Sequence, residues 1–203
     1  MKLYDSVGPN PRVVRMVLAE KGVVVETSRV DLRGGENRRK PYLATNPLGQ
    51  LPALQLDDGT ILTEITAIAE YLDELHPEPP LLGTTPEQRA ETRMWVRRLD
   101  LNIIEPMANG YRYSDGLPLF KDRIRCIPEA APALKEIAHH WLGWLDGQMA
   151  GRSYVVGERF TLADVLLFCF TEFGGKIGQP LDPAWSDLAA WSKRVEERPS
   201  SKG

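Results

Sequence analysis

The feature that most constrains the fold is a proline placed directly before a short apolar run, in Leu51-Pro52-Ala53-Leu54. Proline has no N–H to donate to a sheet, so it fits the first position of a strand or the turn before it. A tight turn is also a place where a cis X–Pro bond costs little, roughly 0.5–1 kcal/mol over trans. The segment therefore predicts a strand that starts at Pro52, after a turn that permits a cis bond.

The residues after this proline predict a hairpin and then a helix. Asp57-Asp58-Gly59 is a hairpin turn signal, and Thr60-Ile61-Leu62-Thr63 is the returning strand. Apolar residues then recur at helical spacing from Glu64 onward, and the helix must end before Pro77. The order of strand, hairpin, strand and helix is typical of the second half of a thioredoxin-like domain.

The first 30 residues predict a βαβ unit. Residues 2–5 form a short strand, and residues 23–30 form a second strand rich in β-branched side chains. Between them, Asn10 is expected to cap a helix that has Pro11 at its first position and ends at Gly22. The crossover is expected to be right-handed, with the two strands parallel.

The clearest linker in the chain is Pro77-Glu78-Pro79-Pro80, because a proline cluster breaks a helix and stiffens the connection. We therefore expect a thioredoxin-like domain over residues 1–76, a linker over 77–84 and an all-helical domain over 85–203. The fold class is then an α/β domain followed by an all-α domain.

The helical half shows several start and stop signals. Thr85-Pro86 starts one helix, which is expected to run to about Asn109, and a second long helix is expected from Leu117 or Phe120. Thr161 and Asp164 have the spacing of a capping box, and the apolar run that follows predicts a buried central helix. The last four residues are expected to fray.

Composition excludes several classes of function. The 203 residues are 42% hydrophobic and 26% charged, as in an ordinary soluble globule, and the net charge of −3 gives no reason to expect a nucleic-acid partner. Cys126, Cys169 and the three histidines show no disulfide or metal spacing, so we expect no metal and a cytoplasmic location. No apolar run approaches ~18 residues, and neither a membrane helix nor a signal peptide is expected.

Three motifs together resemble the cytosolic glutathione transferases, and they span essentially the whole chain. The motifs are residues 46–54 (Asn-Pro-Leu-Gly-Gln-Leu-Pro-Ala-Leu), the helix start from Glu64 to Leu72, and Thr161-Leu162-Ala163-Asp164. The resemblance implies a thioredoxin-like domain, an all-helical domain and a homodimer. It also implies an enzyme that joins the glutathione thiolate to a small electrophile, with glutathione as co-substrate and no other cofactor.

The chain departs from the common family pattern where the thiolate would be stabilised. Relatives often carry Ser, Tyr or Cys in the loop after the first strand, and the aligned residue here is Gly8. Ser6, Asn10 or a group of the helical domain remain as candidates. The Gly-Pro-Asn-Pro sequence resembles an atypical subgroup from yeast and many bacteria, in which groups on a helix of the second domain act through water. The polar candidates in that region are Asn109, Tyr111, Tyr113 and Ser114, with Tyr113 taken as the catalytic candidate.

The resemblance also assigns the glutathione contacts. The main chain of Leu51, held by Pro52, is expected to pair with the main chain of glutathione. Glu64 is expected to meet the γ-glutamyl ammonium, and the amide of Ile65 the γ-glutamyl carboxylate. Ile65 stands where the family usually has Ser, so Thr66 could supply the missing hydroxyl, and the Ile65 side chain fits the core stripe of the helix.

Arg38 or Lys40 is expected to pair with the glycyl carboxylate of glutathione. Val7, Tyr111 and Tyr113 are expected to line a pocket for the electrophile between the domains. The identity of this electrophile is not indicated by any motif.

Two alternatives stay open. The first is another glutathione-dependent enzyme on the same fold, namely a peroxidase, an isomerase or an ether-cleaving catalyst. The second is a non-catalytic binding or regulatory module, which Gly8 and Ile65 keep open because each lacks a hydroxyl that the family commonly uses.

Overall fold

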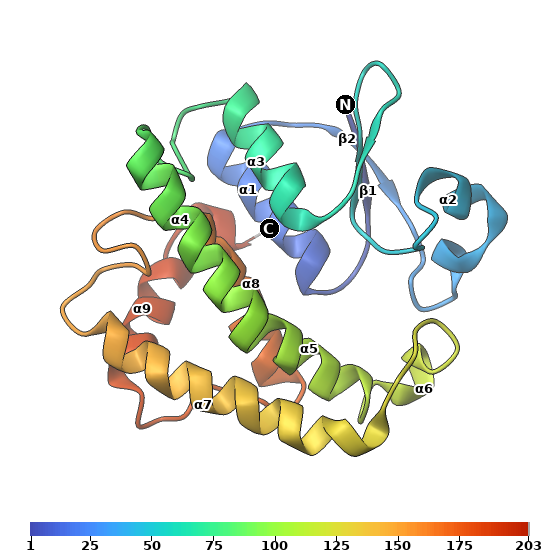
Figure 1. Ribbon diagram of the computed structural model, residues 1–203. Coiled ribbons are helices and arrows are strands. Elements are labelled where there is room, and N and C mark those ends of the chain that lie inside the picture. The colour runs from blue at the N-terminus through green and yellow to red at the C-terminus, as the bar shows by residue number, and fades with distance from the viewer. Residues whose placement is uncertain (203) are drawn as a thin grey trace. The chain divides into compact units, whose positions relative to one another are not determined.

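The computed structural model describes residues 1–202, which form two compact units (Figure 1). The first unit contains residues 1–81 and a C-terminal segment that begins at Pro199, and the second contains residues 82–198. The division falls within the expected linker, 77–84. The C-terminal segment corrects one expectation, because residues 199–202 belong to the first unit and not to the helical one.

The first unit is built on a four-stranded sheet with the order β2-β1-β3-β4. Its strands are β1 (Lys2–Asp5), β2 (Glu26–Arg29), β3 (Ala53–Gln55) and β4 (Ile61–Leu62). β1 pairs with β2 in parallel, as predicted, and with β3 in antiparallel register, while β3 and β4 form the predicted hairpin. The strand expected over 23–30 is shorter, because the Val23 N–H donates to the Leu18 carbonyl at 2.9 Å and so closes the preceding helix.

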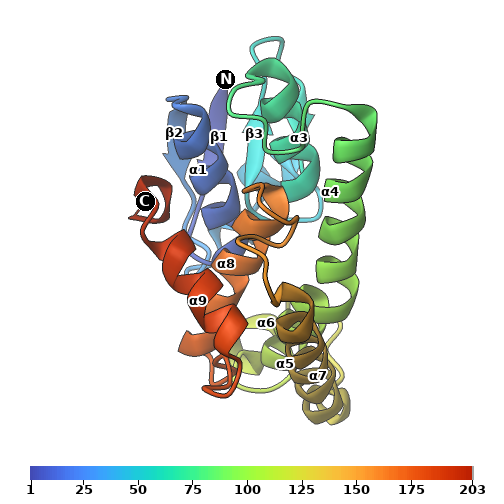
Figure 2. The same cartoon turned by 90° about the vertical axis from the view of Figure 1, so that its left-hand side faces the viewer.

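Two helices of the first unit, α1 (Pro9–Lys21) and α3 (Ile65–Leu75), lie side by side (Figures 1 and 2). Each helix has an apolar, buried side, which includes Val13 and Val17 of α1 and Ile68 and Leu72 of α3. Two short segments, the 3₁₀ turn η1 (Glu36–Arg38) and α2 (Lys40–Thr45), lie between β2 and β3 in the chain.

A buried ion pair joins these two helices to the end of the first unit. The Lys21 ammonium, with no exposed side-chain surface, contacts the Asp73 carboxylate and the Pro79 carbonyl. The same carboxylate oxygen accepts a 2.8 Å hydrogen bond from the Leu81 N–H. These bonds hold residues 79–81 to the first unit. Loss of either charged partner would leave a buried, unpaired charge.

The second unit consists of helices. They are α4 (Pro86–Leu99), the π-helical turn η2 (Asp100–Ile104), α5 (Glu105–Arg112), α6 (Leu117–Phe120), the 3₁₀ turn η3 (Pro128–Ala130), α7 (Ala131–Met149), α8 (Leu162–Lys176) and α9 (Ser186–Glu196). The long helix expected from Leu117 is wrong, since α6 has only four residues. Pro128 disfavours helical geometry in the residue before it, and Ile127 is accordingly not helical, with φ −127° and ψ 84°.

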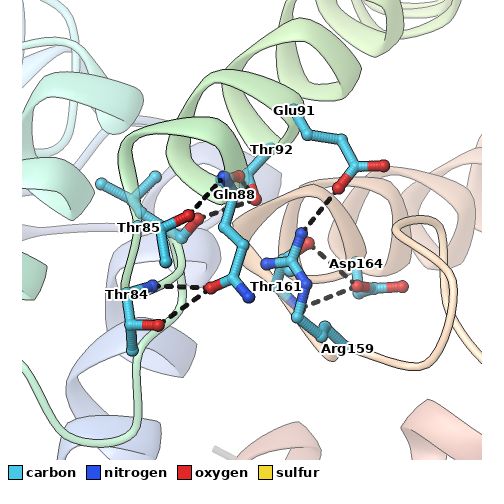
Figure 3. Close-up of polar contacts among 9 residues, drawn as sticks. Thr84, Thr85, Gln88, Glu91, Thr92, Arg159, Thr161 and Asp164 are labelled. Atoms are coloured by element: carbon cyan, nitrogen blue, oxygen red, sulfur yellow. Dashed lines mark hydrogen bonds and ion pairs between the residues drawn. The ribbon is translucent and has the colours of Figure 1, made fainter.

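The predicted capping box at the start of α8 is present (Figure 3). The Thr161 N–H and hydroxyl contact one oxygen of Asp164, at 2.8 and 3.2 Å. The other oxygen accepts hydrogen bonds from the Val155 N–H and the Trp191 indole N–H, both at 2.9 Å. The carboxylate therefore joins three segments of the second unit, and α8 is the predicted buried central helix.

A second cap starts α4 in the same view (Figure 3). The Thr85 hydroxyl oxygen accepts a hydrogen bond from the Gln88 N–H at 3.3 Å, and the Gln88 side chain accepts one from the Thr84 N–H at 2.8 Å. Glu91 of α4 pairs with Arg159, just before α8, at 2.9 Å. The predicted helix start at Thr85-Pro86 is confirmed, and this ion pair holds it to the loop before α8.

Candidate functional site

The candidate site is built around the turn that leads into β3. The Leu51–Pro52 peptide bond is cis, and β3 begins immediately after it. The side chain of Leu51 is buried against Val30 and Tyr42. Because the Leu51 side chain is packed in this cluster, only the main chain of Leu51 can contact a ligand.

Among residues 1–202, the N–H and the carbonyl of Leu51 make no hydrogen bond. Backbone groups of a residue that is only 8% exposed normally have a partner. The carbonyls of the three preceding residues are all taken, each by a side chain from residues 37–46. Leu51 is therefore the place in this loop where an extended peptide can pair with the main chain.

A strained residue stands at the start of α3. Glu64 has φ 66° and ψ 119°, and it is the one residue other than glycine with positive φ among residues 1–202. Such a conformation costs on the order of 1–3 kcal/mol and concentrates at functional sites. The Glu64 side chain is exposed and has no partner within the described chain, so its carboxylate is available to a cation.

The first turn of α3 offers amides that have no partner within residues 1–202, next to this carboxylate. The first bond of the helix runs from the Ile68 N–H to the Glu64 carbonyl, so the N–H groups of Ile65 and Thr66 have no acceptor in the helix. The expectation that the Ile65 side chain belongs to the core is wrong. It is half-buried, because the buried stripe of α3 is formed by Ile68, Ala69 and Leu72.

The two basic candidates have different surroundings. Arg38 donates to the Leu48 carbonyl at 2.8 Å, so part of its guanidinium already holds the loop. Lys40 opens α2 and is exposed, and its ammonium has no partner in the part of the chain that the structure describes. Lys40 is thus the freer cation, while Arg38 lies beside the turn; which of them meets a carboxylate stays a prediction.

The start of α1 differs from the prediction. Gly8 precedes the helix with φ 111°, Pro9 is its first residue, and Asn10 is its second residue and not its cap. A Cβ on Gly8 would touch nothing within 4 Å, so space does not exclude a side chain there. The positive φ does, because side chains with L configuration rarely adopt it.

The prolines on either side of Asn10 limit what this helix end can donate. Neither Pro9 nor Pro11 has an N–H, so Asn10 supplies the one amide of the first three helical positions. Within residues 1–202 the Asn10 side chain makes no hydrogen bond. Asn10 therefore remains a candidate donor to an anion, through both its main chain and its side chain.

Ser6 is not supported as a donor to sulfur. Its hydroxyl donates to the Val30 carbonyl at 2.7 Å, and the residue is 4% exposed. A hydroxyl has one proton, so in this arrangement it joins the end of β1 to the segment after β2. The sequence placed Ser6 in the right loop but could not show this distant partner.

The candidates of the second unit differ in how far they are already engaged. Asn109 bonds to Glu105 and Arg112, at 3.2 and 2.9 Å, and the Ser114 hydroxyl donates to the Gly110 carbonyl at 2.6 Å. The Tyr111 ring packs edge-on against Phe120 and Phe173.

Tyr113 follows the last residue of α5, and its hydroxyl has no partner among the described residues. The Tyr111 hydroxyl likewise has no partner among the described residues, so the two tyrosines are the candidates whose polar groups are least used. Val7, in the first unit, is an apolar residue that is 45% exposed. A role for Val7, Tyr111 and Tyr113 in lining a pocket for a second substrate stays a prediction.

Residues 1–202 were expected to hold neither a metal ion nor a membrane-spanning helix. No group of three or more His, Cys, Asp or Glu side chains is placed to hold a metal ion. Within the same residues, no helix has both the length and the apolar character needed to cross a membrane.

Comparison with known protein families gives two matches. The family model described as "Glutathione S-transferase, N-terminal domain" matches residues 7–75, and "Glutathione S-transferase, C-terminal domain" matches residues 120–199. The first match covers the turn at Leu51 and the start of α3, which are the parts of the candidate site described above.

Individual relatives agree with these matches. Glutathione S-transferase 2 of Saccharomyces cerevisiae is 33% identical over 210 residues, which cover 100% of this chain and 88% of the relative. The crystal structure of Gtt2 from the same yeast superposes with a TM-score of 0.92 at 33% identity, covering 100% and 99% of the two chains. A glutathione transferase homologue from Sulfitobacter, solved with bound glutathione, gives a TM-score of 0.83 at 25% identity over 99% and 94%.

Proposed function

Because this chain belongs to the glutathione S-transferase family, we propose that it is a transferase that joins the thiolate of glutathione to a small electrophilic molecule. The single observation that carries this proposal is the main chain of Leu51, which has no hydrogen-bond partner among residues 1–202 and lies before the cis bond to Pro52. A tripeptide can add to this edge as a short antiparallel strand, through its cysteinyl N–H and carbonyl.

The two ends of glutathione meet groups of opposite charge. Glu64 pairs with the γ-glutamyl ammonium, and the free amides of Ile65 and Thr66 bind the neighbouring carboxylate at the start of α3. Lys40 or Arg38 pairs with the glycyl carboxylate, for which a guanidinium would offer two parallel hydrogen bonds.

The enzyme must also favour the thiolate. A free thiol has a pKa near ~8.5, and lowering it by about two units requires roughly 2.7 kcal/mol of differential stabilisation. The start of α1 supplies part of this through the Asn10 amide and the helix dipole, whose effect is typically about 0.3–1 kcal/mol. The Asn10 side chain and the Tyr113 hydroxyl are the proposed sources of the remainder.

The chemical step is a nucleophilic attack. A lone pair of the glutathione sulfur forms a carbon–sulfur bond at the electrophilic carbon. The electron pair of the bond that breaks leaves with the leaving group or moves onto the electron-withdrawing part of the molecule. Because both reactants are held together, the enzyme avoids several kcal/mol of the barrier.

We also propose that the protein works in the cytoplasm as a homodimer, with glutathione as its co-substrate. Membership of the family supports both points. Light scattering on the purified protein tests the dimer, and a mass near that of one 22.8 kDa chain would overturn it.

Two measurements test the proposed activity. Calorimetry with glutathione should give a saturable binding heat, and chlorodinitrobenzene with glutathione should give a conjugate that the enzyme forms faster than buffer does. Binding of glutathione without conjugation, together with turnover of a hydroperoxide, would indicate that the protein is a glutathione-dependent peroxidase and not a transferase. The absence of binding at millimolar glutathione would overturn the proposal as a whole.

A further inference from the structure

We infer that Tyr42, together with Asn46, is a positioning residue for glutathione, because the two side chains hold the Gln50 carbonyl and thereby aim the Leu51 N–H. This inference rests on the proposed function, in which the main chain of Leu51 receives the cysteinyl part of glutathione. Neither residue is proposed to touch the reacting atoms.

The Gln50 carbonyl oxygen has two side-chain donors. The Tyr42 hydroxyl, from α2, donates to it at 2.6 Å, and the Asn46 amide, from the residue that follows α2, donates at 3.0 Å. The direction of this carbonyl is therefore set by two bonds, one from a short helix and one from the residue after it. A single hydrogen bond would leave the peptide more freedom to rotate.

Peptide geometry passes this direction on to Leu51. The Gln50 carbonyl and the Leu51 N–H belong to the same planar peptide unit, and this unit is trans. In a trans peptide the C=O and N–H bonds point in opposite directions. Since the carbonyl points toward Tyr42 and Asn46, the Leu51 N–H points away from them, and it has no acceptor within residues 1–202.

The residues before Gln50 are held in the same manner. Asn37, only 3% exposed, donates its amide to the Gly49 carbonyl at 2.6 Å. Gly49 has φ 64°, and a Cβ there would lie 2.5 Å from an Arg38 nitrogen and 2.8 Å from the Asn37 carbonyl oxygen. A side chain at position 49 would therefore collide with residues 37 and 38, and the Gly49 carbonyl is held by Asn37.

Asn46 is itself fixed by main-chain bonds. Its N–H donates to the Tyr42 carbonyl at 2.9 Å, and its side-chain oxygen accepts a hydrogen bond from the Leu48 N–H at 3.1 Å. The Leu48 N–H therefore orients the Asn46 side-chain amide, and this amide in turn orients the Gln50 carbonyl. An aspartate at this position could keep the contact with Leu48 but would place an oxygen against the Gln50 carbonyl.

Tyr42 has two roles that a conservative substitution separates. Its ring packs under Val30 and Leu51 and meets the Tyr4 ring edge-on at 5.9 Å, whereas its hydroxyl makes the bond to Gln50. Burial raises the pKa of this hydroxyl, so it stays protonated and remains a donor throughout the physiological range. Tyr42→Phe removes the bond and keeps the packing.

The matched control is Tyr4→Phe. The Tyr4 hydroxyl donates to the Gln55 side chain at 3.1 Å, at the far end of β3 from Pro52, and it makes no bond to residues 48–51. Both variants lose one phenol hydroxyl from the first unit. They differ in whether the lost bond orients the peptide before Leu51.

The test compares the glutathione dissociation constant with kcat at saturating glutathione. Tyr42→Phe should raise the dissociation constant about three- to tenfold, the usual effect of one hydrogen bond, with kcat within about twofold of the wild type. Tyr4→Phe should leave both values unchanged. Asn46→Asp should raise the dissociation constant further, and it serves as the second variant if Tyr42→Phe does not fold.

A second ligand separates this role from the binding of the glycyl end of glutathione. γ-Glutamylcysteine retains the cysteinyl main chain and lacks the glycine, so Tyr42→Phe should weaken it by the same factor as glutathione. Unchanged affinities in Tyr42→Phe and Asn46→Asp, or an equal loss in Tyr4→Phe, would overturn the positioning role while the proposed function stands. Failure of the wild type to bind glutathione would instead overturn the proposed function.

Discussion

The Arg12 guanidinium donates a 2.9 Å hydrogen bond to the main-chain oxygen of Ser201, so the first turn of α1 is tied to the end of the chain. The 3₁₀ turn η4 (Pro199–Lys202) lies against α1, and the Ser200 hydroxyl donates to Glu20 of the same helix. Both serines are 7% exposed. The first unit is thus completed by residues that follow the whole helical unit in sequence.

Deletion of residues 199–203 should therefore destabilise the first unit. We expect the free energy of unfolding to fall by about 1–3 kcal/mol, because two hydrogen bonds are lost and a buried surface of α1 is uncovered. Urea unfolding followed by circular dichroism measures this change. Deletion of residues 202–203 alone is the control, because it keeps both serines, and an equal loss in the two truncations would contradict the explanation.

Glu64→Gln should weaken glutathione binding about five- to twentyfold, because the amide cannot form an ion pair with the γ-glutamyl ammonium. The fold should be unaffected, since the Glu64 side chain has no partner among residues 1–202. Calorimetry measures the affinity. Glu74→Gln, which removes an exposed charge from the last turn of the same helix, is the control and should bind as the wild type does.

Substitution of each basic candidate by alanine should have a different effect on the KM for γ-glutamylcysteine, a ligand that lacks the glycine of glutathione. Lys40→Ala should raise the KM for glutathione severalfold with little change in kcat, and should not affect γ-glutamylcysteine, which lacks the glycyl carboxylate. Arg38→Ala should weaken both ligands, because it also releases the Leu48 carbonyl. Steady-state kinetics with each thiol checks this, and an unchanged KM in either variant would remove that residue from the site.

Ser6→Ala should lower the free energy of unfolding by about 1 kcal/mol, the usual contribution of one hydrogen bond. It should leave the pKa of the thiol of bound glutathione unchanged. The ultraviolet absorbance of the thiolate, titrated with pH in the complex, measures this pKa. Asn10→Ala is the comparison and should raise it. A higher thiol pKa in Ser6→Ala would restore Ser6 as a donor to sulfur.

Asp164 should make the stability of the second unit depend on pH. Burial raises the pKa of Asp164 to about 6, although hydrogen bonds from Val155, Thr161 and Trp191 oppose the shift. An unfolded chain releases this proton near pH ~4, so between about pH 4 and 6 the folded state holds more protons and stability falls as pH rises. The effect should total roughly 2–3 kcal/mol.

Asp164→Asn tests this dependence, because the amide does not titrate. The variant should be less stable at every pH. Both carboxylate oxygens of Asp164 accept hydrogen bonds, and the NH₂ group that replaces one of them would face donors and could not accept their bonds. In urea unfolding, the difference in the free energy of unfolding between the wild type and Asp164→Asn should become smaller from pH 4 to pH 7. A constant difference across that range would show that the carboxylate does not titrate there.

The parts of the fold that follow local rules were predictable from the sequence. Pro52, the Asp57-Asp58-Gly59 turn and the Thr161–Asp164 box each act on residues within a few positions, and the structure shows the strand, hairpin and helix start that they predict. The role of the Leu51 main chain as a glutathione contact came instead from the family resemblance, and it stays a prediction.

The parts that depend on distant contacts were not predictable. The bond from Ser6 to Val30, the return of residues 199–202 to α1 and the Tyr42 bond to Gln50 have no local sequence signal. The π-helical turn at Asp100–Ile104 was missed for a related reason, since its residues fit an ordinary helix equally well. Asn10 was assigned as a cap because its preference for caps is strong, but Gly8 supplies the positive φ and Pro9 takes the first position.

The two prolines beside Asn10 have a consequence for selectivity among anions. A phosphate group carries several oxygens and is held by helix starts that offer it a cradle of amides. A helix with one amide in its first three positions cannot form such a cradle, but it can still direct a hydrogen bond at a single sulfur atom. Inorganic phosphate and nucleotides, which share the cell with glutathione, should therefore be poor competitors at this end of α1.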